Sequence, residues 1–252
     1  MLKGDKMESY KRLSKIYDTL IYEDIDYDKI SSKILSLCKE FNIDYKNYLD
    51  LACGTGTLSA KISPAFKKSF LVDMSEDMLM EAYEKLRSNR VNATIVCQDM
   101  SELNINSKFN LITCSLDSTN YIVEEENLKN YFKGVSSHLE PEGIFVFDIN
   151  SYYKLSKVLG NNTYSYDEED IFYSWDNYFE EDTLYMNLVF FVKSGELYER
   201  FDEEHIEKAY KTEHLDEVLD ECGLKVIEKV DNYGEEKITD LTERITYIVK
   251  KK

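Results

Sequence analysis

The sequence has little of what marks secreted, membrane-spanning or loop-rich proteins. Only two prolines and nine glycines occur among 252 residues, so few long irregular linkers are expected. No apolar run approaches the roughly 20 residues that span a bilayer, and residues 1–12 are polar, unlike a signal core. The odd number of cysteines and the absence of a CxxC pair argue against a disulfide framework or a zinc site. The cysteines are Cys38, Cys53, Cys97, Cys114 and Cys222. We therefore expect a cytoplasmic protein with reduced thiols, no metal and no membrane contact.

Positive charge is also scarce. The chain has 31 Lys and Arg against 49 Asp and Glu, a formal net charge of −18. Proteins that grip nucleic acids or anionic membranes use clustered Lys and Arg, so both partners are disfavoured. The charge is compatible with a cationic or neutral small substrate, and simple solubility explains it equally well.

Short apolar segments alternate with helical patterns along most of the chain. The predicted strands cover residues 48–53, 69–73, 93–97, 110–115, 144–147, 224–230 and 244–250. Ser75 is predicted to begin a helix, Gly223 to end one, and Pro141-Glu-Gly143 to form the turn before the strand at 144–147. Strands that alternate with helices pair in parallel, and right-handed crossovers place helices on both faces. We predict an α/β, doubly wound sheet over 41–150 and 211–252, preceded by a helical cap over 1–40.

The alternation of strands and helices is interrupted between residues 151 and 210. Three strands are predicted at 171–179, 183–193 and 196–206, joined by short turns and rich in aromatic residues. We interpret this segment as an inserted antiparallel sheet that covers a substrate. The alternative is that its aromatics simply pack against the main domain or a second subunit, so the protein is expected to be a monomer or a homodimer.

A glycine-rich turn is the most informative local feature. The strand at 48–53 runs into Gly54-Thr-Gly56 and a helix, and the next strand ends on Asp73. Glycine allows close backbone approach and positive φ, and a carboxylate at that strand end can accept bonds from ribose hydroxyls. The pattern predicts a nucleoside-containing cofactor.

Acidic residues recur at or just past the predicted strand ends. They are Asp50, Asp73, Asp99, Asp117 and Asp148. In doubly wound sheets ligands bind beyond the carboxyl ends of the strands, so these acids are assigned to the ligand-facing edge. The alternative is that some of them only cap the following helices.

The glycine turn alone does not identify the cofactor. A dinucleotide site favours G-x-G-x-x-G, but Ser59 occupies the third glycine position, which weakens an NAD-linked oxidoreductase as an alternative. No Gly-Lys-Ser/Thr follows, so a Walker A loop is excluded.

Four ordered motifs closely resemble those of the class I S-adenosylmethionine-dependent methyltransferases, of the type that acts on small molecules. They are Asp50-Leu-Ala-Cys-Gly-Thr-Gly, Leu-Val-Asp73-Met74-Ser75, Cys97-Gln-Asp99-Met100 and Leu139-Glu-Pro-Glu-Gly143. The resemblance covers residues 48–150 and 212–250 and implies a seven-stranded, Rossmann-like methyltransferase sheet with its last strand antiparallel. Ala52 departs from the pattern, because many members have glycine there.

The resemblance also implies a cofactor site for S-adenosyl-L-methionine. The loop beside the methionyl part would contain Asp50, Ala52, Cys53, Gly54, Thr55 and Gly56. Asp73 would accept the ribose hydroxyls, and Met74, Asp99 and Met100 would meet the adenine. Leu116 and Asp117 would lie beside the sulfonium. Tyr17, in a Tyr-Asp element typical of these enzymes, would bind the cofactor carboxylate.

Methyl transfer needs orientation and exclusion of water more than it needs an acid or a base, so the sequence offers no strong catalytic residue. His205 is a weak candidate base, and a structural histidine is the alternative. The expected acceptor is a nitrogen or oxygen of a small molecule. A non-catalytic cofactor-binding or assembly protein is the remaining alternative.

Overall fold

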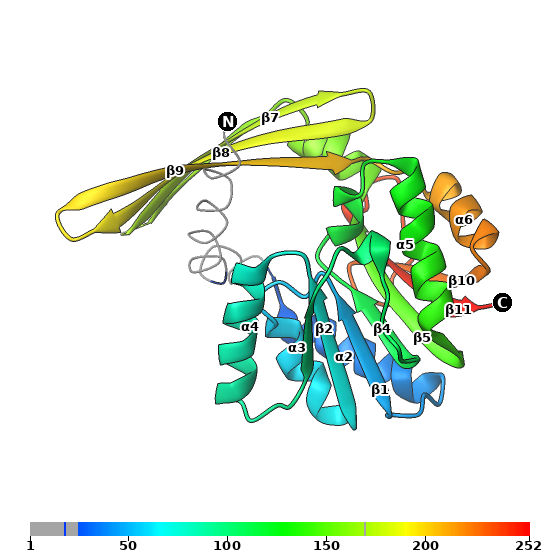
Figure 1. The fold of residues 1–252 in the computed structure, drawn as a ribbon. Helices are drawn as coiled ribbons and strands as arrows, with labels where there is room; N and C mark the ends of the chain where they lie inside the picture. Colours follow the sequence, from blue (N-terminus) through cyan, green and yellow to red (C-terminus); the bar gives the residue numbers. More distant parts are fainter. Residues whose placement is uncertain (1–17, 19–24, 169) are drawn as a thin grey trace.

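A seven-stranded sheet forms the centre of the computed structural model, which describes Asp18 and residues 25–168 and 170–252 (Figure 1). Its strands lie in the order β10-β11-β5-β4-β1-β2-β3. Their bounds are β1 (Asn47–Leu51), β2 (Lys68–Asp73), β3 (Thr94–Cys97), β4 (Phe109–Cys114), β5 (Leu139–Asn150), β10 (Leu224–Asp231) and β11 (Arg244–Lys251). β11 runs antiparallel to both of its neighbours, and the other neighbouring strands of this sheet pair in parallel. The predicted doubly wound sheet with an antiparallel last strand is confirmed.

Helices cover both faces of this sheet. Their bounds are α2 (Tyr27–Glu40), α3 (Thr57–Ile62), α4 (Glu76–Ser88), α5 (Glu125–His138) and α6 (Thr212–Glu221), with short helical turns η1 (Ser63–Ala65), η2 (Met100–Glu102) and η3 (Ser118–Tyr121). Successive strand residues point to opposite faces, so Tyr48 joins the core beneath α2 and α3, while Leu49 joins the core beneath α5 and α6. Each such side chain contributes about 1.5–3 kcal/mol on full burial.

Local capping signals fix the start of α4 and the end of α6. The Ser75 side chain accepts a hydrogen bond from the Met78 backbone at 3.3 Å, which fixes the start of α4 as the sequence predicts. Gly223 follows α6 with φ of +78°, a conformation that favours glycine, and it ends that helix.

Strand β5 begins earlier and ends later than predicted. The Pro-Glu-Gly segment before Ile144 is not a turn but an irregularity inside β5, where the register to β4 shifts. A Cβ at Gly143 would lie 2.9 Å from the Phe109 carbonyl oxygen, so glycine permits this close approach of two backbones. At its other end β5 continues to Asn150, because antiparallel β11 pairs with it there. Asp148 therefore lies inside a strand and not at a strand end.

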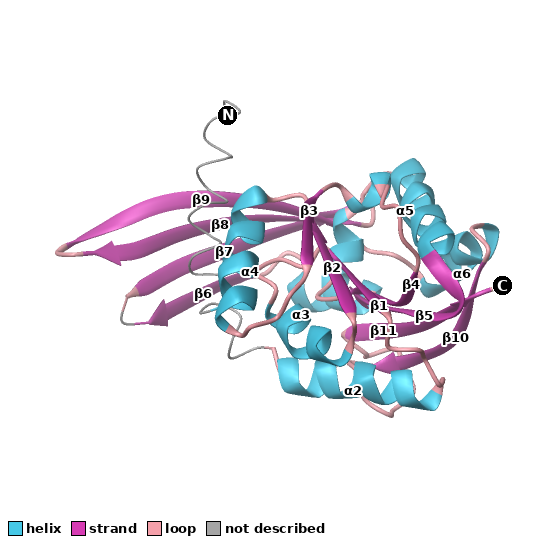
Figure 2. Cartoon of the chain, turned by 60° about the horizontal axis from the view of Figure 1, so that its bottom comes forward, coloured by secondary structure: helices cyan, strands magenta, loops and turns pink. Residues whose placement is uncertain are grey.

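A second sheet of four antiparallel strands, hereafter the arm sheet, projects from the main domain (Figures 1 and 2). Its strands are β6 (Thr163–Glu168), β7 (Ile171–Glu180), β8 (Thr183–Ser194) and β9 (Leu197–Lys208), and a π-helical segment η4 (Lys154–Leu159) precedes them. The three strands predicted at 171–179, 183–193 and 196–206 are confirmed as β7, β8 and β9, and the prediction missed β6. That strand is short, lies at the edge of the arm sheet, pairs with β7, and alternates aromatic with small polar residues.

The arm sheet is joined to the main sheet through Asn120. The Asn120 side-chain amide donates to the Asn150 carbonyl of β5 at 3.1 Å and to the Lys208 carbonyl of β9 at 2.9 Å. Asn120 is fully buried and also accepts from the Asn150 backbone N–H at 3.0 Å. A buried amide that loses such partners is costly, so this joint fixes the base of the arm sheet.

Candidate active site

The glycine turn between β1 and α3 has the backbone that its sequence predicts. Gly54 and Gly56 have φ of +53° and +73°, and Ala52 has φ of +51° although it carries a side chain. A left-handed conformation costs a non-glycine residue about 1–2 kcal/mol. The Cys53 N–H donates to the Val72 carbonyl at 3.0 Å, which ties the turn to β2.

Asp73 holds this turn from the end of β2. One carboxylate oxygen accepts from the Gly54 N–H at 2.8 Å, and the other accepts from the Ser75 N–H at 2.9 Å. Burial raises the pKa of Asp73, while these backbone donors oppose the rise. A carboxylate has about four acceptor positions, so these backbone donors leave acceptor capacity for a ligand's hydroxyl groups.

Asp50 faces the interior beneath the turn. Its carboxylate accepts a hydrogen bond from Ser59 and another from Thr113 at 2.7 Å, and the residue is only 2% exposed. Burial raises the pKa of Asp50 to about 6. Ser59, at the third glycine position of the dinucleotide motif, thus ties α3 to β1 through its hydroxyl.

Two pockets meet at Ala52, on the carboxyl edge of the sheet. The first is lined by Tyr27, Asp50, Ala52, Cys53, Gly54, Thr55, Thr57, Leu58, Ser115, Leu116 and Ser118. The second is lined by Ala52, Asp73, Met74, Gln98, Asp99, Met100, Ser101, Tyr121, Ile122, Val123 and Asn127. An elongated ligand lying across Ala52 would therefore contact both groups of residues.

Asp99 and two methionines lie together in the lining of the second pocket. Asp99 Oδ1 accepts from the Ser101 N–H and hydroxyl, both at 2.8 Å, which starts η2. Met74 is largely exposed, whereas Met100 packs on the core with its sulfur 3.8 Å from Cys114 Sγ. These side chains offer an acceptor and polarizable apolar surface, which suit a flat heteroaromatic ring.

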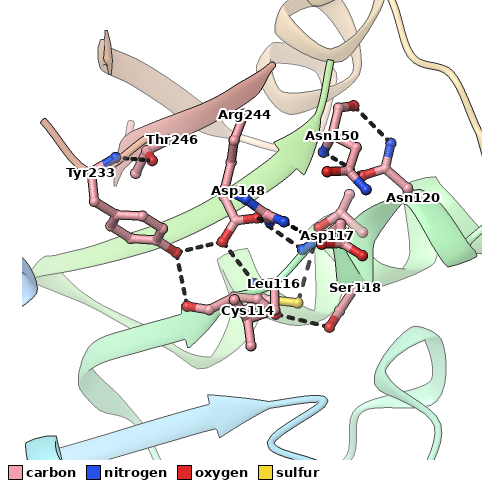
Figure 3. A network of polar contacts seen from close by, with 12 residues as sticks. Cys114, Leu116, Asp117, Ser118, Asn120, Asp148, Asn150, Tyr233, Arg244 and Thr246 are labelled. Carbon is pink, nitrogen blue, oxygen red and sulfur yellow. Dashed lines mark hydrogen bonds and ion pairs between the residues drawn. The ribbon is translucent and has the colours of Figure 1, made fainter. Parts of the chain in front are cut away.

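Leu116 and Asp117 form a strained turn after β4 (Figure 3). Both have left-handed backbones, with φ of +59° and +52°. Their N–H groups donate to the two carboxylate oxygens of Asp148, each at 2.8 Å. Asp148 is fully buried, so its assignment to the ligand-facing edge is corrected: its carboxylate holds this turn from inside.

Tyr17 lies outside the described residues, but the neighbouring Asp18 is placed. Its carboxylate accepts from Thr55 at 2.7 Å and from Lys85 at 2.6 Å. Lys85 also donates to the hydroxyls of Thr55 and Thr57. Asp18 thus contacts both the glycine turn and α4, and Tyr27, 8% exposed, lines the first pocket.

His205 lies on β9 and faces Tyr121 of η3. The Tyr121 hydroxyl and His205 Nδ1 are 3.3 Å apart, and the two rings meet edge to face. Burial lowers the pKa of His205, while the negative charge of Asp117 opposes the shift. Tyr121 also lines the second pocket, so this pair connects the arm sheet to the pocket wall.

The structure brings most predicted residues to one edge, and it adds residues that the sequence did not single out. The first pocket is lined by Asp50, Ala52, Cys53, Gly54, Thr55 and Leu116, and the second by Ala52, Asp73, Met74, Asp99 and Met100. Gly56 and Asp117 line neither pocket: Gly56 lies against Ala82 of α4, and Asp117 lies between Leu116 and Ser118, which line the first pocket. Lys85, Tyr121, Glu207, Tyr233 and Arg244 were missed. The antiparallel last strand was the available signal for Arg244, since it places the start of β11 beside the end of β5.

The two turn glycines should tolerate alanine differently. A Cβ at Gly56 would lie 3.0 Å from Ala82 Cβ and 3.3 Å from Ala82 Cα in α4, whereas a Cβ at Gly54 meets nothing within 4 Å. Both variants require a strained left-handed residue, but only Gly56→Ala also forces α4 to move. We expect Gly56→Ala to lower the free energy of unfolding by about 1–3 kcal/mol more than Gly54→Ala. Chemical denaturation of the two variants measures this difference, and equal losses would contradict the close packing.

Among the described residues, no group of three or more His, Cys, Asp or Glu side chains could hold a metal ion. Within that same part of the chain, no helix has the length and apolar character needed to span a membrane.

Comparisons with known proteins agree on one family. A family model described as a methyltransferase domain matches residues 49–143. A putative methyltransferase, YqeM, of Bacillus subtilis (strain 168) is 30% identical, with 96% of this chain and 97% of that protein covered. A solved S-adenosylmethionine-dependent methyltransferase from Clostridium acetobutylicum ATCC 824 is 53% identical, with a TM-score of 0.91 over 96% of this chain and 98% of that chain. The sugar N-methyltransferase KedS8 from Streptoalloteichus sp ATCC 53650 has the same fold, with a TM-score of 0.76, 18% identity, and coverage of 94% and 93%.

Proposed function

Since the chain belongs to the family of S-adenosylmethionine-dependent methyltransferases, we propose that it methylates a nitrogen or oxygen atom of a small molecule. The observation that carries the proposal is the pair of pockets that meet at Ala52, one beside the glycine turn and one beside Asp73 and Asp99. S-adenosylmethionine has a matching form, with an amino-acid part, a central sulfonium and an adenosine.

In this proposal the cofactor lies across Ala52. The ribose hydroxyls donate to the remaining acceptor positions of Asp73. The adenine enters the second pocket, where Asp99 accepts from its amino group and the two methionines cover its faces. The methionyl part enters the first pocket, between the glycine turn and the Ser115–Ser118 segment.

The acceptor is proposed to enter from the side of the arm sheet. β9 contacts η3 there, and His205 and Tyr121 connect the two elements. The site would hold the acceptor atom in line with the methyl group and exclude water. In well-oriented systems such positioning lowers the activation barrier by about 7–11 kcal/mol. An amine or alcohol acceptor also loses a proton, which the neutral imidazole of His205 can accept.

A small nitrogen-containing acceptor is consistent with the known neighbours. The sugar N-methyltransferase KedS8 shares the fold, including most of this chain's length. The acidic composition favours a cationic or neutral acceptor over a nucleic acid. An amine is therefore the first acceptor class to test, and an alcohol is the second.

Isothermal titration of the full chain with S-adenosylmethionine and S-adenosylhomocysteine tests the cofactor part. We expect both to bind, with NAD as a non-binding control. The acceptor part is tested by incubating the protein with labelled S-adenosylmethionine and a panel of amino sugars, other amines, phenols, alcohols, RNA and unrelated proteins. Methyl label in an amine or alcohol supports the proposal. Label confined to RNA or protein would overturn it.

Substitution of His205 by asparagine should change the pH dependence once an acceptor is found. Because burial lowers the pKa of His205, wild-type activity should rise with pH below about 6.5 as the imidazole loses its proton. His205→Asn should lose that rise and about 10²-fold in kcat. A parallel pH profile of both enzymes is the measurement, and identical profiles would show that His205 is not the base.

A further inference from the structure

A buried ionic cluster lies directly behind the turn that lines the first pocket (Figure 3). Arg244, at the start of β11, donates from Nη1 to Asp148 and from Nη2 to Asp117, the latter at 2.7 Å. The exposed fractions of the three side chains are 11% for Arg244, 0% for Asp148 and 18% for Asp117. One guanidinium therefore joins two carboxylates from two other segments of the chain.

The cluster fixes a backbone that is unfavourable by itself. Leu116 and Asp117 are both left-handed, and Asp148 accepts both of their N–H groups at 2.8 Å. The Tyr233 hydroxyl donates to Asp148 at 2.5 Å and is hydrogen-bonded to the Ser115 hydroxyl at 2.9 Å, which extends the support to the first residue of the turn. Arg244 thus holds the turn twice, through the Asp117 side chain and through the carboxylate that binds its backbone.

The side of the Leu116–Asp117 turn that faces away from this cluster borders the first pocket. Ser115, Leu116 and Ser118 line the first pocket opposite the glycine turn. In the proposed pose of the cofactor, this wall lies beside the sulfonium and its methyl group. A shift of the turn would therefore change the surroundings of the reacting carbon more than those of the adenosine.

We propose that Arg244 is a positioning residue for methyl transfer, which holds the Leu116–Asp117 turn against the sulfonium end of the cofactor site. The inference rests on the proposed function, because it assumes that S-adenosylmethionine occupies the two pockets. Arginine suits the task, since its planar guanidinium can contact two carboxylates in a fixed geometry, whereas a lysine ammonium acts as a single point charge.

A purely structural role for Arg244 predicts a different result. Loss of fold stability weakens S-adenosylmethionine and S-adenosylhomocysteine alike, because the two ligands share every part except the methyl group and the positive charge. A positioning role instead affects the surroundings of the methyl group and the positive charge, which S-adenosylmethionine has and S-adenosylhomocysteine lacks. The ratio of the two dissociation constants is therefore the informative quantity, and it requires no acceptor.

The test uses Arg244→Lys and the milder Asp117→Asn, which leaves the buried Arg244–Asp148 pair in place. Arg200→Lys is the matched control, because Arg200 makes a similar two-point pair with Asp202 on the arm sheet. We expect the Kd for S-adenosylmethionine to rise about tenfold in Arg244→Lys and about threefold in Asp117→Asn, with the Kd for S-adenosylhomocysteine rising less than half as much. The control should change neither.

A spectroscopic signal gives the second readout. The carbon-13 resonance of labelled methyl in bound S-adenosylmethionine should move in both site variants and stay in place in Arg200→Lys. Equal weakening of both ligands, with an unmoved methyl resonance and a lower melting temperature, would overturn the positioning role. Failure of the wild-type protein to bind either ligand would instead refute the proposed function.

Discussion

Replacement of Asp73 by alanine is expected to weaken S-adenosylmethionine binding by about 5- to 150-fold, equivalent to about 1–3 kcal/mol. Asp73 acts twice in the proposed site. Its carboxylate orients the Gly54 N–H and the start of α4, and its remaining acceptor positions are assigned to the ribose. Alanine removes both, and it leaves the Gly54 and Ser75 N–H groups without their acceptor.

Titration calorimetry of three variants separates these contributions. Asp73→Asn keeps one carbonyl oxygen and should lose less affinity than Asp73→Ala. Glu76→Ala removes an exposed acid from the same helix start and should bind like the wild-type protein. Because the ribose is common to both ligands, the losses should be the same for S-adenosylmethionine and S-adenosylhomocysteine. An unchanged dissociation constant in Asp73→Ala would remove Asp73 from the site.

Substitution of Glu207 by glutamine is expected to flatten the dependence of stability on pH. Glu207 is 3% exposed and accepts from the Asn150 amide at 3.0 Å. Burial, aided by the charge of Asp117, raises the pKa of Glu207 from 4.5 to about 8, while Asn150, Lys154 and Arg244 oppose the rise. The folded protein therefore keeps a proton that the unfolded chain has already released.

The sign of the effect follows from that proton. Below about pH 4.5 Glu207 is protonated in both states, and its full contribution is present. As the pH rises towards 8, the unfolded state releases the proton first, so stability falls by up to about 5 kcal/mol. Glutamine has no proton to release and should not show this fall.

Urea denaturation between pH 5 and 8 compares wild type with Glu207→Gln. Asp50, whose pKa is also raised, contributes equally to both proteins and cancels in the difference. Glu204→Gln, an exposed position on the opposite face of β9, is the control and should follow the wild type. A constant difference between wild type and Glu207→Gln across this range would show that Glu207 is ionised in the folded protein.

Much of the architecture could be predicted from sequence because its signals are local. Apolar segments gave the strands of the main sheet, Ser75 marked a helix start, and Gly223 marked a helix end. The glycine turn and Asp73 are adjacent in the structure for a general reason, since the carboxyl ends of parallel neighbours meet at one edge.

The remaining features depend on long-range pairing, which no local pattern encodes. β6 forms because it pairs with β7, and β5 extends to Asn150 because β11 pairs with it there. Asp148 looked like a ligand group because it is acidic and near a strand end. Its carboxylate instead points into the protein, where it pairs with Arg244, almost a hundred residues later in the chain.

A crystal structure of the full chain with S-adenosylhomocysteine tests the central claim most directly. We expect continuous ligand density across Ala52, with the ribose hydroxyls within hydrogen-bonding distance of Asp73, the adenine beside Asp99 and the sulfur facing the Leu116–Asp117 turn. Density for the ligand elsewhere, or a ribose that does not contact Asp73, would contradict the site described above.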